Sequence, residues 1–154
     1  LPLYRQAATI RRAAPIVMAG ITIGSVTAIA TGYAITTSLG GSREIALSMA
    51  PKSATTPIAI ALSQQLGGLP SLSAVFAIVA GITGAVAGPR ILDLLRITDP
   101  RARGLAIGVT SHGIGTSRAL LEDETTAAFS GLAMALNGLA TSLLVTVVLG
   151  LLGA

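Results

Sequence analysis

The sequence predicts an all-α integral membrane protein, a helical bundle in which two broken or re-entrant segments form a repeated and inverted arrangement. The 154-residue chain is 52% hydrophobic and only 10% charged, whereas average soluble domains carry about 25% charged residues. A chain this apolar cannot cover its surface with polar side chains, and the same composition excludes disorder. Long uncharged stretches, broken at two places by polar residues, glycines and prolines, give the rest of the prediction.

The first uncharged run covers residues 13–42 and predicts a membrane-spanning helix at about 15–38. A spanning helix needs about 20 predominantly apolar residues, and this run is too long for the apolar core of a signal peptide. Gly20 and Gly24 form a GxxxG pattern, which favours close approach of a neighbouring helix.

The second uncharged run, 53–89, cannot form one helix because prolines and a Gly-Gly pair divide it. We expect a short helix at 43–50, a break at 51–57, a second short helix at about 57–66, a turn at 67–70 and a full helix at 71–88. Segment 90–103 mixes arginines, aspartates and apolar residues. It predicts a short interfacial helix or loop on the cytoplasmic side, by the positive-inside rule.

Residues 104–117 are uncharged but too few to span a bilayer. The sequence SHGIGTS at 111–117 predicts a second polar break, and the acidic cluster at 122–124 is expected to be a solvated helix end. The last uncharged run predicts a spanning helix at about 127–152. Units 43–88 and 104–152 therefore share one order, a broken segment followed by a full helix, within a single membrane domain over 1–154.

The basic residues decide between two topologies. If Arg11, Arg12 and the 90–103 segment all face the cytoplasm, an even number of crossings separates them, and segment 43–66 must re-enter. If segment 43–66 instead crosses as a broken helix, one basic cluster lies outside. We favour the re-entrant or half-spanning form.

Two interrupted hydrophobic segments in corresponding positions are the best sequence indication of a transporter binding site. Backbone breaks in a membrane occur where protein or a water-filled cavity surrounds them, and the N–H groups of a half-helix favour anions. The candidate substrate-binding residues lie in the two breaks and in the last helix: Lys52, Ser53, Thr55, Thr56, His112, Gly113, Gly115, Thr116 and Asn137. This set suits a small anion with hydroxyl groups, such as a hydroxycarboxylate.

Several candidates also have a purely structural interpretation. Lys52 could extend to an interface. His112 could be a hydrogen-bonded packing residue instead of a titrating group for proton coupling, and the hydroxyls could bond back to their own helices. Asn137 could serve interhelical packing. Gly113 and Gly115 are expected where the backbone approaches the substrate closely.

Other functional classes find no support in the sequence. The chain has no cysteine and a single histidine, so disulfides, thiolate sites and a multi-histidine metal site are not expected, and no cofactor is predicted. Dinucleotide-binding and hydrolase motifs fail in residue type or setting, so we do not expect an enzyme. The net charge of +4 is interpreted as a topology signal and not as nucleic-acid binding.

The two breaks resemble the signature stretches of the LrgB/CidB family. The stretches are PKSATTPIA at 51–59 and HGIGT at 112–116, and Gly88-Pro89, LRI at 95–97 and SGLAM at 130–134 follow the same pattern. The resemblance covers about residues 1–150. Family members usually have further apolar helices before the position of Leu1, so this chain is expected to lack them.

The resemblance implies two functions. Bacterial members are described as antiholin-like or holin-like proteins that affect murein hydrolase export and lysis, together with a small LrgA/CidA-type membrane protein. The plastid relative is a glycolate/glycerate translocator. We therefore expect a multi-pass protein of the cell (inner) membrane, oligomeric, that transports small carboxylates such as glycolate, glycerate or pyruvate with proton coupling. The alternative is a holin-like or antiholin-like regulator of lysis.

Overall fold

A computed structural model describes residues 7–154 of the chain, with side chains from residue 10 onward. This part of the chain is all-α, as the sequence predicts, and contains no strand. The helices are α2 (Ala7–Ser38), α3 (Arg43–Met49), α4 (Thr56–Leu66), α5 (Pro70–Leu94), α6 (Pro100–Ala119) and α7 (Glu124–Leu151). Three segments, Ile10–Ser38, Pro70–Leu94 and Glu124–Leu151, are long and apolar enough to cross a membrane. The chain is therefore a membrane protein, with three candidate spans in its described part.

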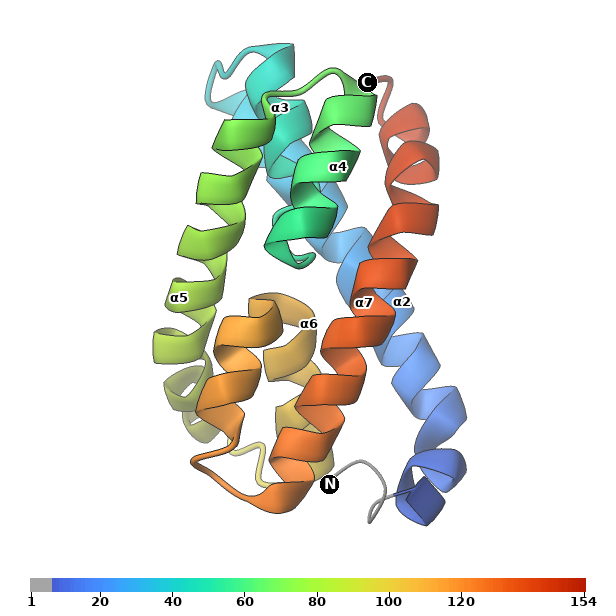
Figure 1. Cartoon of the computed structure of the whole chain (residues 1–154), viewed down its shortest axis with the longest axis vertical. Coiled ribbons are helices and arrows are strands. Elements are labelled where there is room, and N and C mark those ends of the chain that lie inside the picture. The colour runs from blue at the N-terminus through green and yellow to red at the C-terminus, as the bar shows by residue number, and fades with distance from the viewer. Residues whose placement is uncertain (1–6) are drawn as a thin grey trace.

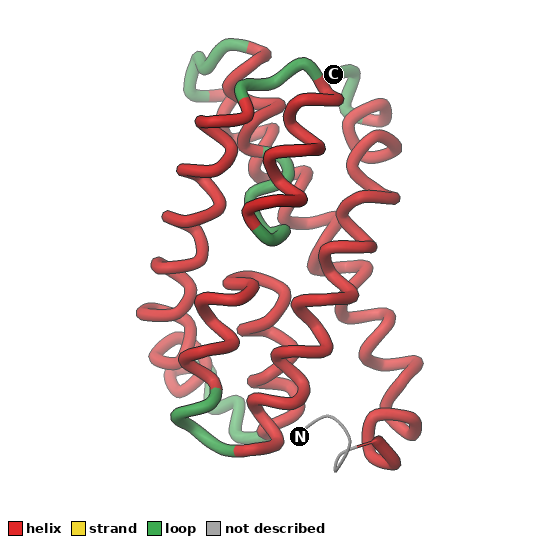
Figure 2. Tube along the Cα trace, in the orientation of Figure 1, coloured by secondary structure: helices red, strands yellow, loops and turns green. Residues whose placement is uncertain are grey.

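Two helical hairpins enter the bundle from opposite ends. In Figure 1, α2, α5 and α7 run along the length of the bundle, whereas α3 and α4 descend from the upper end, turn at mid-height and return. The turn between α3 and α4 is the loop drawn at mid-height in Figure 2. α6 rises from the lower end and reverses at His112, the residue where its backbone leaves the helical region. Both broken segments thus double back, as the re-entrant form requires.

The sequence-based boundaries need correction between 88 and 117. α5 does not end at 88 but includes Pro89 and continues to Leu94, since apolar membrane helices tolerate a proline when neighbours satisfy the freed groups. The expected interfacial element at 90–103 does not exist as a unit: its first part completes α5 and its last part begins α6. The second break is also narrower than expected, because only His112 within α6 is non-helical.

Side chains cap the starts of three of the described helices. Ser42 caps α3, Asp99 caps α6 and Asp123 caps α7, each by accepting a hydrogen bond from a backbone N–H of the first turn. α4 differs, because Thr55 precedes it without a side-chain cap. α4 ends at Gly67, whose φ of 82° is the left-handed conformation that glycine adopts without steric cost.

Glycines let the first arm of α6 approach two spans. A Cβ at Gly20 or Gly24 of α2 would lie 2.7 Å from Leu105 Cδ2 or 2.8 Å from Val109 Cγ1, so the GxxxG pattern of α2 does face a close helix neighbour. On its other side this arm lies against α7. The second pair of glycines, Gly104 and Gly108, lies at this contact with α7. The sequence analysis did not identify this pair.

Candidate functional site

The tip of the first hairpin is the turn between α3 and α4, and it holds Lys52 against α2. Lys52 is half-buried, and its Nζ donates a hydrogen bond to the Ala28 carbonyl at 3.0 Å. The ammonium lies beside Gly32, where a Cβ would come within 2.9 Å of Nζ. Lys52 therefore lies in the turn at mid-height of the bundle, and its ammonium group is hydrogen-bonded to a backbone carbonyl of α2.

Ser53 and the start of α4 leave polar groups without partners at the same tip. Ser53 is 3% exposed, and its Oγ has no hydrogen-bond partner. Thr55 and Thr56 are half-buried at the start of α4, and Thr55 provides no side-chain cap. The N–H groups of a helix's first turn have no partner within the helix and carry partial positive charge. A buried hydroxyl and an uncapped helix start thus lie within a few residues of Lys52.

The tip of the second hairpin is His112, which is tied to α5. Its φ of 40° and ψ of −133° are unusual for a residue with a side chain, and such strain costs about 1–3 kcal/mol. The ring is 4% exposed, and Nε2 lies 2.8 Å from the Ala77 carbonyl. Since a carbonyl only accepts, Nε2 carries the proton of this bond. The ring fits beside Gly81, where a Cβ would lie 2.7 Å from His112 Cε1.

The residues after His112 differ in how much space surrounds them. A Cβ at Gly115 would overlap Ser111 Cβ, so Gly115 lets the two arms of α6 close on each other. A Cβ at Gly113 would meet only Met134 Sδ, at an ordinary 3.7 Å. Thr116 bonds back to its own arm, with Oγ1 2.9 Å from the His112 carbonyl, and lies 2.9 Å from Ser130 Oγ of α7.

Asn137 of α7 contacts both hairpins at once. It is 1% exposed, and its Nδ2 donates to the Ser53 carbonyl at 2.9 Å and to the Val109 carbonyl at 3.3 Å. Its Oδ1 accepts from Ser25 Oγ of α2 at 2.7 Å. The structure therefore joins Asn137 directly to Ser53, whereas no hydrogen bond between described residues links His112 to the first hairpin.

Two buried hydroxyl residues near this centre were missed by the sequence analysis. Ser25 is fully buried and donates a hydrogen bond to Asn137 Oδ1. Thr141 is fully buried one turn after Asn137, and its Oγ1 has no partner. Both residues lie in spans that are otherwise largely apolar. Thr141 could have been recognised in the sequence as a polar residue at helical spacing from Asn137.

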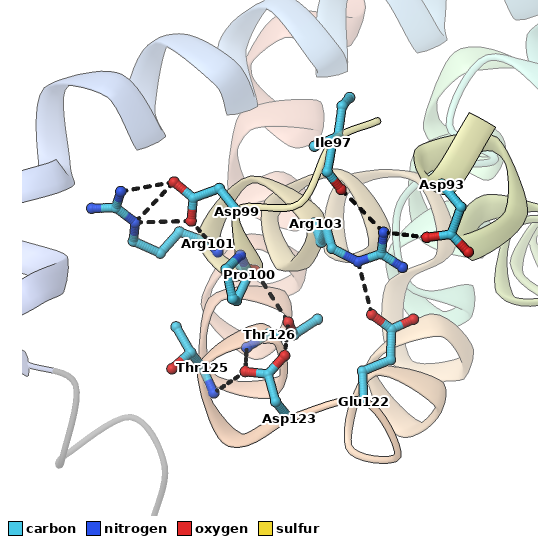
Figure 3. A network of polar contacts seen from close by, with 10 residues as sticks. All are labelled: Asp93, Ile97, Asp99, Pro100, Arg101, Arg103, Glu122, Asp123, Thr125 and Thr126. Carbon is cyan, nitrogen blue, oxygen red and sulfur yellow. Dashed lines mark hydrogen bonds and ion pairs between the residues drawn. The ribbon is translucent and has the colours of Figure 1, made fainter. Parts of the chain in front are cut away.

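The lower end of the bundle carries an ionic network that fixes the base of the second hairpin (Figure 3). Arg103 donates to Glu122 at 3.0 Å, to Asp93 at 2.7 Å and to the Ile97 carbonyl at 3.1 Å. The side chains of Arg103 and Glu122 are only 14% and 16% exposed. The acidic cluster is thus not merely a solvated helix end, because Glu122 is paired.

Two aspartates of this network cap helices, and their hydrogen bonds lower their pKa values. The side-chain and backbone bonds from Arg101 lower the pKa of Asp99. Burial alone would raise the pKa of Asp123, but hydrogen bonds from Thr126 and Thr125 lower it more. Both carboxyls are therefore held in the ionised form that accepts hydrogen bonds from the first turns of α6 and α7.

Two surface grooves lie beside α6. One of about 280 Å³ runs between α5 and the first arm of α6, beside Gly84, Gly88 and Ile107, and its wall is almost entirely apolar. Another of about 170 Å³ lies at the lower end near Arg101. Neither is lined by Lys52 or His112. Among residues 10–154, no group of three or more histidine, aspartate or glutamate side chains could hold a metal ion.

Known proteins of bacteria are similar to this chain over most of its length. It is 36% identical over 135 residues to the uncharacterized protein YxaC of Bacillus subtilis, covering 88% of this chain and 59% of that protein. The holin-like protein CidB of Staphylococcus aureus is 29% identical over 148 residues, covering 96% and 65%. The antiholin-like protein LrgB of Bacillus mycoides is 26% identical over 153 residues, covering 99% and 66%.

The chain spans about 59–66% of the length of these relatives. No solved structure matches it. The sequence profile of the LrgB-like family matches residues 1–151, nearly the whole chain. The chain therefore belongs to the LrgB-like family.

Proposed function

We propose that this chain acts in the cell membrane as a holin-like or antiholin-like protein, affecting murein hydrolase export and lysis. The observation that carries this proposal is the family match over residues 1–151, together with relatives named antiholin-like LrgB and holin-like CidB. Those relatives are longer than this chain, and the described helices belong to the part that they share with it.

The distribution of charge supports a multi-pass orientation in the inner membrane with the lower end of the bundle in the cytoplasm. Most described arginines belong to elements that meet at that end in Figure 1: Arg11, Arg12, Arg90, Arg96, Arg101, Arg103 and Arg118. Arg43 belongs to the upper end, at the start of α3. Short segments rich in arginine and lysine remain on the cytoplasmic side of a membrane.

A second candidate, secondary transport of small carboxylates, is favoured by one structural observation. Two broken hairpins approach mid-height from opposite ends, which is typical of transporters that bind their substrate between inverted repeats. A simple oligomeric pore needs no such pair. The first tip offers the Lys52 ammonium, the buried Ser53 hydroxyl and the uncapped start of α4, and these groups suit a carboxylate with hydroxyl groups, such as glycolate or glycerate.

Partner proteins follow from the same proposal. Relatives carry the names LrgB and CidB, and we propose that a small LrgA/CidA-type membrane protein joins the full-length protein in an oligomer. Any assay of function should therefore contain both proteins.

Uptake by proteoliposomes separates the two candidates. Vesicles containing the full-length protein and its partner are loaded with a fluorescent dye and given labelled glycolate or pyruvate. Saturable uptake with retention of the dye supports transport, whereas unsaturable entry together with dye release supports a holin-like pore. For transport, Lys52→Met should abolish uptake and Lys52→Arg should impair it, because a planar guanidinium replaces a point charge. Thr141→Val, which removes a hydroxyl without a partner, is the matched control.

A further inference from the structure

Each hairpin break leaves backbone carbonyls without their usual partners. In an α-helix the carbonyl of each residue accepts from the N–H four residues later. Val109 lies in the last turn before the reversal at His112, so its carbonyl lies where that ladder is interrupted. Ser53 lies outside the helices, and the backbone bonds of its turn run to the Met49 and Pro51 carbonyls instead. In an apolar environment such orphaned acceptors are costly.

One amide group satisfies a carbonyl at both breaks. A primary amide has two N–H donors and one carbonyl acceptor. The two donors of Asn137 are used on the Ser53 and Val109 carbonyls, both within 3.3 Å of the same nitrogen. Nothing of its donor capacity remains for a substrate in this conformation. Asn137 was a substrate-binding candidate in the sequence, but its contacts are those of a connector.

The two carbonyls fix the orientation of this amide. Reversing it would turn Oδ1 toward the Ser53 and Val109 carbonyl oxygens, which replaces two donor–acceptor pairs by repulsive ones. The fully buried Ser25 of α2 completes the set, because its Oγ donates to Asn137 Oδ1 at 2.7 Å. Ser25 therefore holds the amide in place through the acceptor that the two hairpins leave unused.

We infer that Asn137, anchored to α2 by Ser25, couples the two hairpin tips, so that a displacement of either tip is transmitted to the other. Both tips are held by the same amide group. If the carbonyl of one tip moves away, the Asn137 amide either moves with it or is released, and its bond to the carbonyl of the other tip changes. This role is independent of whether the protein passes carboxylates or acts as a holin-like protein, since it concerns only how the two breaks are joined.

Hydrogen–deuterium exchange of the full-length protein in nanodiscs tests the coupling. Peptides covering 50–57 and 108–115 report on the two tips, and a peptide from the middle of α5 reports on the rest of the bundle. Asn137→Leu should raise exchange at both tips by about tenfold or more, with α5 unchanged. Thr141→Val, on the same helix one turn away, should change neither tip.

Ser25→Ala keeps the test decisive if Asn137→Leu does not fold. It should raise exchange at both tips together and by a smaller factor. Increased exchange at only one tip in Ser25→Ala or Asn137→Leu would overturn the inference. An equal increase along α5 would overturn it as well.

A double-mutant comparison separates coupling from simple packing. Lys52→Met removes the bond to α2 from the first tip only. It should raise exchange at the second tip when Asn137 is present and leave that tip unchanged in the Asn137→Leu background. An effect on the second tip that persists without Asn137 would contradict the coupling.

Discussion

Substituting Gly108 by alanine should destabilise the bundle because Gly108 lies where the first arm of α6 meets α7. A Cβ at this position would overlap the Ser130 carbonyl oxygen and lie 2.8 Å from Ala133 Cβ. A backbone carbonyl and a Cβ cannot move away by changing a rotamer. The whole arm would therefore have to shift from α7, and the bond from Asn137 to the neighbouring Val109 carbonyl would lengthen with it.

The magnitude follows from comparison with Gly131 of α7, where a Cβ would meet only Thr116 Cγ2, at an ordinary 3.9 Å. Both substitutions gain the same helix propensity, about 1 kcal/mol over glycine. Only Gly108→Ala also carries the cost of overpacking, about 1–3 kcal/mol. The free energy of unfolding of Gly108→Ala should therefore lie about 1–3 kcal/mol below that of Gly131→Ala.

Reversible unfolding in mixed micelles of mild detergent and SDS, followed by far-ultraviolet circular dichroism, measures this difference. Gly131→Ala should equal or exceed the wild type in stability. If Gly108→Ala were as stable as Gly131→Ala, the close contact between α6 and α7 at Gly108 would be refuted.

Three further substitutions give distinct outcomes. Gly113→Ala should not lower the stability of the micelle-embedded protein, because its Cβ would meet only Met134 Sδ at an ordinary 3.7 Å and alanine has the higher helix propensity; a large loss would refute the space assigned there. Asp123→Ala should cost about 0.5–2 kcal/mol at neutral pH. Since the pKa of Asp123 is lowered on folding, that stabilisation is complete above the unfolded value of about 3.9 and lost as pH falls through the folded one, so melting curves of mutant and wild type should converge in acid. Arg103→Lys should lower thermal stability, because an ammonium cannot reproduce the guanidinium fork that bonds Glu122 and Asp93 together; an unchanged melting temperature would show that the network contributes little.

The sequence was sufficient to locate the spans and the breaks because both depend on local composition. Uncharged length placed α2 and α7, and prolines and glycines marked the turn at Lys52 and the reversal at His112. The predicted end of α5 at 88 was wrong, because the helix continues through Pro89 to Leu94, as an apolar helix with close neighbours can.

The contacts of the candidate site could not be predicted, because they depend on how distant segments pack. Asn137 and Ser25 are 112 residues apart, and nothing local to either residue indicates that they meet. The amide could be recognised only as a polar group in an apolar span. Its use at both breaks depends on the opposed directions of the two hairpins, which hydropathy does not specify.

Labelling of single cysteines from each side of the membrane tests the opposed hairpins most directly, since the chain has no cysteine of its own. Leu39 and Leu69 flank the α3–α4 hairpin, and Leu95 and Leu121 flank α6; all four are exposed. With a membrane-impermeant maleimide, Leu39→Cys and Leu69→Cys should react from one side, and Leu95→Cys and Leu121→Cys from the other. Reaction of the two cysteines that flank one hairpin from opposite sides would show that this segment crosses the membrane and would contradict the account.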